Sequence, residues 1–263
     1  MLIRELKVNF KSFCIWSIIT ISIFLIVFLV YPSIISSPEM ESLDDMMKMF
    51  PEDLLKAFNM DISSLDSAYG WLKSEGFVFV LLIINCYAGI LGANILLKEE
   101  NDKTSEYIGI LPIRRTNIVI SKAIVGVFYI ILLTLITGTF NYVSLKISGS
   151  FDEKQYILLS LTPLLSALPI FFICLFISTF TNKTKKMLGV SLGIVLISYI
   201  LNTISSLSEK VEFLKYFSVF TLSDIRNVIT KVVIDSKMIL ICLAGCILFL
   251  IITLINYNKK EFV

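Results

Sequence analysis

The chain contains no histidine, and this absence excludes several kinds of catalytic site. Ser/His and Cys/His nucleophiles lack their base, and metal sites lose their commonest side-chain ligand. The five cysteines all lie inside apolar runs, so they predict neither a disulfide framework nor a zinc site. The phosphate-binding pattern G-x-x-x-x-G-K-[ST] is missing as well. We therefore expect no enzyme activity in the chain itself, and no bound metal, cofactor, ATP or nucleic acid.

Charge is also scarce. Only 17% of the 263 residues are charged, 56% are apolar, and the mean hydropathy is +0.86. A soluble domain has about 25% charged residues. The composition therefore predicts a membrane protein.

Six runs without Asp, Glu, Lys or Arg are long enough to cross a hydrocarbon core of about 30 Å as helices. These runs are 13–31, 77–97, 123–145, 156–181, 187–207 and 238–257. They predict an all-α membrane protein with six transmembrane helices in a single domain, residues 1–263, with a large outer loop at 32–76. Pro163 and Pro169 are expected to kink or break the fourth helix.

Lysine and arginine predict the orientation. The segments 1–12, 98–122, 182–186 and 258–263 carry 13 basic residues in 48 positions. The segments expected on the opposite side of the membrane are 32–76, 146–155 and 208–237, and they carry 10 basic residues in 85 positions. Because basic residues concentrate in cytoplasmic loops, both termini are expected in the cytoplasm.

The N-terminal residues have the pattern of an amphipathic helix. The apolar side chains of this helix fall on one arc, at Leu2, Ile3, Leu6, Phe10 and Phe13, and the basic ones on another, at Arg4, Lys7 and Lys11. Such a helix is expected to lie in the inner interface, with its cations near anionic headgroups. It is either an anchor or a lever that joins the first span to a cytoplasmic partner.

The outer segments are amphipathic too. Helical spacing after Ser42 and again after Pro51 predicts two short helices in the outer loop, which shield the bundle or guard an exit for a lipophilic substrate. The segment 211–235 is aromatic but too charged to span, so it is expected to lie in the outer leaflet or to dip partly into it.

Polar and small residues are few inside the spans. Asn85, Gly89 and Gly92 share one face of the second span. Small and amide residues usually mark helix contacts in membranes, so this face predicts helix packing, with the lining of a transport path as the alternative.

The loop between the second and third spans carries nine charged residues at 98–122, together with an apolar patch. Thr104 can cap a short helix with Glu106 near its start, and Pro112 ends it. Tyr107 and Ile108 begin its apolar face. A short, rigidly held amphipathic helix of this kind is suited to docking another protein.

The stretch LLKEENDKTSEYIGILPIRRTNIVISKAIVG resembles the loop motif of type-two ATP-binding-cassette (ABC) export permeases, in which a glutamate-rich helix end precedes a Gly-Thr-x-Glu-Leu-Leu-Leu-Ser-Leu-Pro-x-x-Arg pattern. The matching positions are Glu99, Glu100, Thr104, Glu106, Leu111, Pro112, Arg115 and Lys122. Two positions differ from the family pattern. Lys103 replaces the glycine before the threonine, and Gly109 replaces a leucine or a neighbouring residue of the apolar patch. The six spans extend the resemblance over the whole chain.

The resemblance implies a permease subunit of the bacterial cell membrane. The loop would be a cytoplasmic coupling helix seated in a separate ATPase dimer, which would hold the ATP and Mg. A second permease chain, identical or homologous, would complete the exporter, and the substrate would be hydrophobic or amphipathic, such as a peptide, toxin or lipid-like molecule. The coupling residues would be Glu99, Glu100, Thr104, Glu106, Tyr107, Ile108, Leu111, Pro112 and Arg115. The rival hypothesis is a non-transporting mechanotransmission or sensory subunit driven by the same kind of ATPase.

Overall fold

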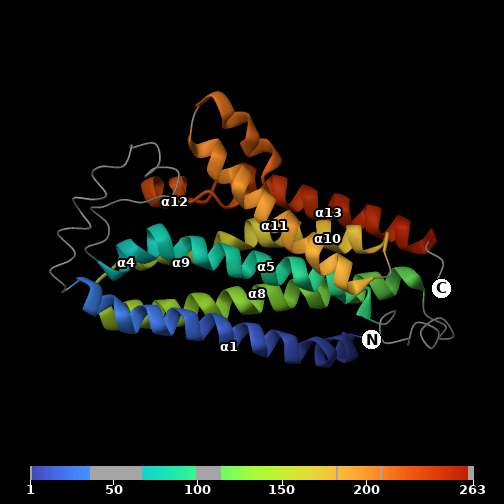
Figure 1. Cartoon of the computed structure of the whole chain (residues 1–263), viewed down its shortest axis with the longest axis horizontal. Coiled ribbons are helices and arrows are strands. Elements are labelled where there is room, and N and C mark those ends of the chain that lie inside the picture. The colour runs from blue at the N-terminus through green and yellow to red at the C-terminus, as the bar shows by residue number, and fades with distance from the viewer. Residues whose placement is uncertain (1, 36–66, 99–113, 182, 208, 260–263) are drawn as a thin grey trace.

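The computed structural model describes residues 2–35, 67–98, 114–181, 183–207 and 209–259 (Figure 1). These ranges contain six helices or helix pairs that are long and apolar enough to cross a membrane, as predicted. The spans are α1 (Leu2–Ile35), α5 (Phe77–Ile95), α8 (Arg115–Ser148), α9 (Glu153–Leu161) with α10 (Pro163–Ser178), α11 (Thr184–Leu207) and α13 (Ser236–Lys259). The two termini lie at the same end of the bundle, which we call the terminal end (Figure 1).

The N-terminal segment and the first span form one continuous helix. α1 has no proline or glycine before Pro32, so nothing interrupts its hydrogen bonds near residue 12. The predicted faces of the segment are partly wrong. Phe13 of the predicted apolar arc is buried, but Leu2, Ile3 and Phe10 are exposed. The buried stripe begins instead with the polar residues Glu5 and Asn9, which therefore face the bundle.

The second, third and fourth spans form the core. In the most apolar 18-residue window of each, 61% of α5, 56% of α8 and 56% of the α9–α10 span is buried. The same share is 22% for α1, 22% for α11 and 17% for α13. The last three helices are therefore peripheral, with apolar faces available to lipid or to another chain.

The fourth span is broken at one of its two prolines. α9 begins where the Asp152 carboxylate accepts hydrogen bonds from the backbone N–H groups of Lys154 and Gln155. It ends at Leu161, and Pro163 starts α10, a position where a missing N–H costs little. Pro169 lies inside α10 without ending it. The prediction of a break is thus confirmed at Pro163, and Pro169 is accommodated within the helix.

Short elements connect the spans away from the terminal end. They are α4 (Ala68–Trp71), the π-helical turn η2 (Leu72–Gly76), the 3-10 helices η3 (Glu209–Phe217) and η4 (Val219–Ser223), and α12 (Arg226–Lys231). η3 packs along α11, and the two rise together away from the other long helices (Figure 1). The two short helices predicted after Ser42 and Pro51 lie outside the described residues.

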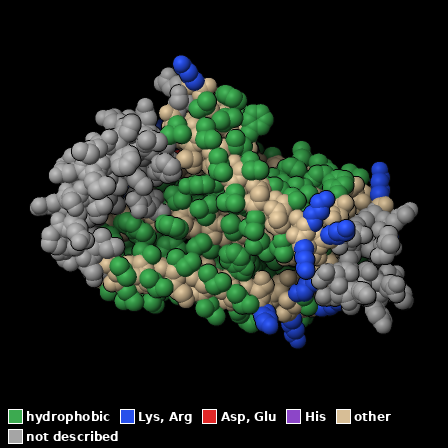
Figure 2. All heavy atoms as spheres, in the orientation of Figure 1, with side chains coloured by type: hydrophobic (Ala, Val, Ile, Leu, Met, Phe, Trp, Pro, Cys, Tyr) green, Lys and Arg blue, Asp and Glu red, His purple; other side chains and the backbone are tan. Residues whose placement is uncertain are grey.

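The surface separates apolar from basic side chains. Apolar side chains cover the flanks of the bundle, and Lys and Arg side chains gather at the terminal end (Figure 2). Ten basic residues lie there at the surface of the described part of the chain: Arg4, Lys7, Lys11, Lys98, Arg114, Arg115, Lys183, Lys185, Lys186 and Lys259. Such a distribution fits a bundle whose flanks face hydrocarbon and whose basic end faces headgroups and water.

Candidate functional site

A buried polar network lies halfway along the core spans. The Asn85 amide of α5 donates to the Ser166 hydroxyl of α10 over 3.0 Å and to the Leu81 carbonyl of its own helix over 2.8 Å. Ser223 of η4 donates to the Thr162 carbonyl at 2.9 Å and lies 2.8 Å from the Ser166 hydroxyl. We call Asn85, Thr162, Ser166 and Ser223 the mid-span network. It joins α5, the break in the fourth span and η4.

The mid-span network shows that the segment after α11 returns into the bundle. Ser218 donates to the Ser198 carbonyl at 2.6 Å, and the backbone N–H of Val219 donates to the Ser198 hydroxyl at 2.9 Å. Ser198 lies within α11 rather than at its end, and Ser223 is only 2% exposed. Part of segment 211–235, the element η4, therefore packs inside the bundle, where the Ser198 hydroxyl accepts from the N–H of its first residue. The position of this segment relative to the outer leaflet stays a prediction.

The Asn85 side chain is only partly satisfied. Its oxygen is buried and has no hydrogen-bond partner among the described residues, and Asn85 itself is fully buried. An unsatisfied buried polar atom costs about 1–3 kcal/mol. The mid-span network therefore includes a free acceptor, the Asn85 side-chain oxygen, to which a hydrogen-bond donor on a bound molecule could donate.

The two glycines on the same face bring helix backbones together. A Cβ atom at Gly92 would overlap the backbone carbonyl oxygen of Phe171 in α10, and one at Gly89 would lie 3.3 Å from a methyl group of Val195 in α11. The face that carries Asn85, Gly89 and Gly92 thus lies against α10 and α11 in the described structure.

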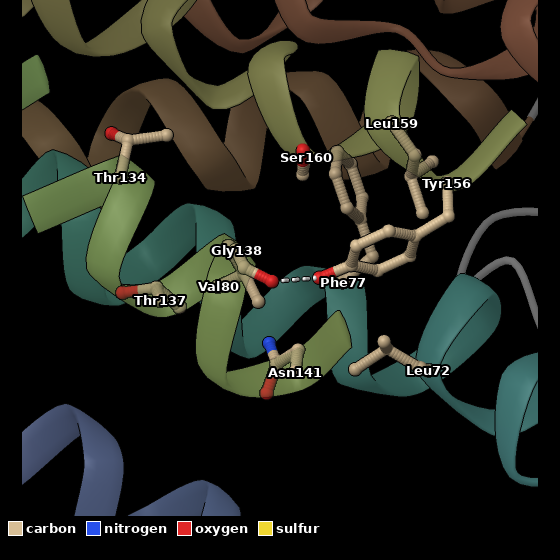
Figure 3. Close-up of a pocket in the computed structure, with 10 residues that line it drawn as sticks. All are labelled: Leu72, Phe77, Val80, Thr134, Thr137, Gly138, Asn141, Tyr156, Leu159 and Ser160. Atoms are coloured by element: carbon tan, nitrogen blue, oxygen red, sulfur yellow. Dashed lines mark hydrogen bonds between the residues drawn. The ribbon is translucent and has the colours of Figure 1, made fainter. Parts of the chain in front are cut away.

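A small cavity lies between the mid-span network and the end opposite the termini. Its volume is ≈ 20 Å³, enough for about one water molecule. Figure 3 shows the Tyr156 hydroxyl pointing to the Gly138 carbonyl across this space, a hydrogen bond of 2.7 Å. The lining residues come from η2, α5, α8 and α9: Leu72, Phe77, Val80, Thr134, Thr137, Gly138, Asn141, Tyr156, Leu159 and Ser160. All of them are uncharged.

Gln155 holds the elements beyond this cavity together. Its amide oxygen accepts from the Tyr69 hydroxyl at 2.7 Å, and its amide nitrogen donates to the Ile229 carbonyl at 2.9 Å. Burial, with the nearby Asp152 carboxylate, raises the pKa of Tyr69 above its ordinary value, so the hydroxyl keeps its proton and remains a donor. One side chain of α9 thus connects α4 with α12.

The predicted coupling residues lie almost entirely outside the described structure. This holds for Glu99, Glu100, Thr104, Glu106, Tyr107, Ile108, Leu111 and Pro112. The ninth, Arg115, is the first residue of α8, and its guanidinium donates to the Asn258 carbonyl of α13 at 3.2 Å. Among the described residues, no group of three or more Cys, Asp or Glu side chains is placed to hold a metal ion.

Sequence reasoning missed the charged contact beside this loop. Lys122 lies inside α8 and is 1% exposed, and its Nζ atom lies 3.3 Å from the Glu5 carboxylate of α1. The sequence pattern alone places Lys122 in the loop and Glu5 in the N-terminal interfacial helix. The one sequence signal for this contact is that Glu5 and Lys122 each stand at helical spacing from apolar residues, as a residue on a buried helix face would.

The comparison with protein families decides what this bundle is. Residues 3–262 match the family described as ABC-2 family transporter protein. The chain belongs to this family. The resemblance inferred from the 98–122 loop is thereby confirmed over nearly the whole chain.

As a member of the ABC-2 transporter family, the chain is a membrane subunit of an ABC transporter, and permeases of this kind work with ATPase subunits. No curated protein and no solved structure matches it. The family leaves the substrate of this permease and the direction of transport open, so both have to be argued from its interior.

Proposed function

We propose that the chain is the permease subunit of an exporter that moves a hydrophobic or amphipathic substrate outward, driven by ATP hydrolysis in a separate ATPase subunit. The proposal is carried by the chemistry of the interior. Among the described residues, the buried charged side chains are Glu5 and Lys122, both near the terminal end. The mid-span network and the cavity offer only hydroxyl, amide and apolar groups.

An uncharged interior favours some substrates over others. A charged solute that enters hydrocarbon depth needs a counter-charge or water to replace its hydration shell. An apolar chain needs neither, and hydroxyl and amide groups can orient the polar part of an amphipathic molecule. The interior therefore supports a lipid-like or amphipathic peptide substrate over an ion or a sugar phosphate.

The orientation follows from the surface charge. The ten basic side chains at the terminal end support a cytoplasmic location for that end, because cytoplasmic loops concentrate Lys and Arg. The segment 99–113 would then face the ATPase, and the returning element η4 would face the exit. With this orientation the cavity and the mid-span network lie between the ATPase and the outer surface, so an exported substrate would pass them on its way out. The outward direction itself rests on the resemblance of the 98–122 loop to export permeases.

A second permease chain completes the proposal. The three peripheral helices α1, α11 and α13 carry most of the exposed large apolar side chains, and some of this surface would contact a partner permease, identical or homologous. The cavity described above holds about one water molecule, so a larger substrate needs more room than this cavity offers. A path between two such bundles would provide that room.

The test is transport in inside-out liposomes that contain the permease and the ATPase subunit that copurifies with it. Probes are a fluorescent lysophospholipid and a cationic amphipathic peptide. We expect ATP-dependent accumulation of at least one probe inside the liposomes, and none with an ATPase variant that binds but cannot hydrolyse ATP. Accumulation of neither probe, or ATP-driven movement in the opposite direction, would contradict the proposal.

One observation favours the mechanotransmission alternative. Three aromatic side chains of η3 are largely exposed: Phe213 by 58%, Tyr216 by 81% and Phe217 by 73%. On the outer surface, such side chains could bind a partner protein as well as lipid. The alternative predicts that a specific outer protein copurifies stoichiometrically and is released when Tyr216 and Phe217 are replaced by serine.

A further inference from the structure

The first turns of α1 are bound to both helices that flank the segment 99–113. On the α8 side, Lys122 Nζ lies 3.3 Å from the Glu5 carboxylate, and the Tyr129 hydroxyl donates to the Leu6 carbonyl at 2.7 Å. On the α5 side, Lys98 Nζ donates to the Val8 carbonyl at 3.0 Å. We call these three contacts the N-terminal clamp.

Lys122 sits at the centre of the clamp. Besides Glu5, its ammonium group donates to the Ile95 carbonyl at the end of α5, at 2.6 Å. One side chain therefore connects α8, α5 and α1, and both members of the ion pair are at most 2% exposed. Removing one partner would leave a buried charge uncompensated, so the pair resists being pulled apart.

α1 then carries this attachment to the opposite end of the bundle. It is a single helix of 34 residues without an internal break, about 50 Å long. Near its far end the Tyr31 ring lies 6.3 Å from the Trp71 ring of α4. Trp71 directly precedes η2, whose Leu72 lines the cavity.

We propose that the Glu5–Lys122 ion pair makes α1 a lever, which moves with the two helix ends that flank 99–113 and transmits their displacement to the cavity end. This inference rests on the proposed function, because it takes the ATPase to act on the bundle through that segment. Glu5 and Lys122 are positioning residues: they act through α1 and touch neither ATP nor substrate.

The decisive variant separates the charge pair from the stability of the fold. In Glu5→Gln with Lys122→Met, both charges are removed together, so neither is left buried alone. The matched control is Lys122→Arg, which keeps the charge and the hydrogen-bond donors. Each variant carries spin labels on exposed positions of α1 and α8 near the cavity end, Val30→Cys and Val143→Cys, in a background without native cysteines. Labelled chains are diluted with unlabelled ones so that only intrachain distances report.

In the unaltered chain and in Lys122→Arg, we expect the distance between positions 30 and 143 to change when the bound ATPase is trapped with ATP. In the neutral pair, we expect normal ATPase copurification and a melting temperature within a few degrees, but no ATP-dependent change in this distance. A neutral pair that shows the full change would overturn the lever while leaving the proposed function intact. An unaltered chain that neither binds nor stimulates an ATPase would instead overturn the proposed function.

A second measurement decides the question if the neutral pair does not assemble. In the unaltered chain, labels at Ile3→Cys and Ile120→Cys report on the clamp itself. The clamp requires this distance to stay constant between nucleotide states while the distance between positions 30 and 143 changes. A clamp distance that changes as much as the far distance would show that α1 does not move with α8.

Discussion

Ser223 and Ser166 are separated by 57 positions in the chain, yet their hydroxyl oxygens lie 2.8 Å apart in the middle of the bundle. The contact exists because the chain turns back after α11 and places η4 against α10. It links the element next to the proposed exit with the broken fourth span. Movement of either element has to break or carry this hydrogen bond.

The first prediction concerns this contact. Ser223→Ala removes the hydrogen bonds to Thr162 and Ser166, and we expect the free energy of unfolding to fall by about 1 kcal/mol, the usual size for such bonds in membranes. Thermal unfolding of the purified permease measures the change. The control is Ser206→Ala, because that exposed hydroxyl bonds only within α11. Equal stability of the two variants would contradict the structural role of the mid-span network.

A matched pair of glycines tests the packing of α5. Gly92→Ala would place a methyl group onto the Phe171 carbonyl, so α5 and α10 must separate, at a cost of about 1–3 kcal/mol. At Gly193 in α11, a Cβ atom meets nothing within 4 Å. Gly193→Ala should therefore leave the isolated permease unchanged or slightly more stable, because alanine favours helix. Chemical unfolding compares the two, and similar losses would argue against the close approach at Gly92.

Gln155 is predicted to hold α12 in place. Gln155→Leu leaves the Tyr69 hydroxyl and the Ile229 carbonyl without their partner, so we expect amide hydrogen exchange in residues 226–235 to rise by roughly tenfold. Exchange in α5 should not change. Lys154→Ala, on an exposed neighbouring position, is the control. Unaltered exchange in Gln155→Leu would show that α12 is held by other contacts.

The orientation is tested by labelling with an impermeant maleimide. In a background without the native cysteines, Asp152→Cys should react in intact cells, whereas Asn101→Cys should react only after the membrane is permeabilised. The reason is the concentration of basic residues on the side that carries residue 101. Labelling of residue 101 in intact cells would reverse the proposed direction of the whole bundle.

Docking of the ATPase is predicted to depend on the loop between α5 and α8. Tyr107→Asp with Leu111→Asp places two carboxylates in an apolar contact and costs several kcal/mol if they are buried unpaired, so the ATPase should detach while the permease remains inserted. Glu106→Ala should cost only about 0.3–1 kcal/mol, weakening coupling without abolishing binding. Copurification and permease-stimulated ATP turnover measure both. Normal binding by the double variant would exclude this loop as the coupling helix.

The spans were predictable from sequence because hydropathy is a local property. Each apolar run predicts its own helix. Pro163 predicts the break, because its ring cannot continue the preceding turn. Pro169 has the same local signal but remains inside α10, where surrounding helices accommodate it. Lys122 was assigned to a loop because a lysine next to an apolar run normally marks the membrane boundary. Its burial depends on Glu5, and no local pattern connects two residues 117 positions apart.

That separation also bears on how the protein is made. Glu5 enters with the first span, and its counter-charge is synthesised 117 residues later, roughly 6–23 s at ordinary rates of translation. During this interval the carboxylate lacks its ion-pair partner, and burying an unpaired carboxylate is costly. We therefore expect the start of α1 to stay near water until the third span arrives. The order of the helices along the chain would then set the order in which the bundle closes.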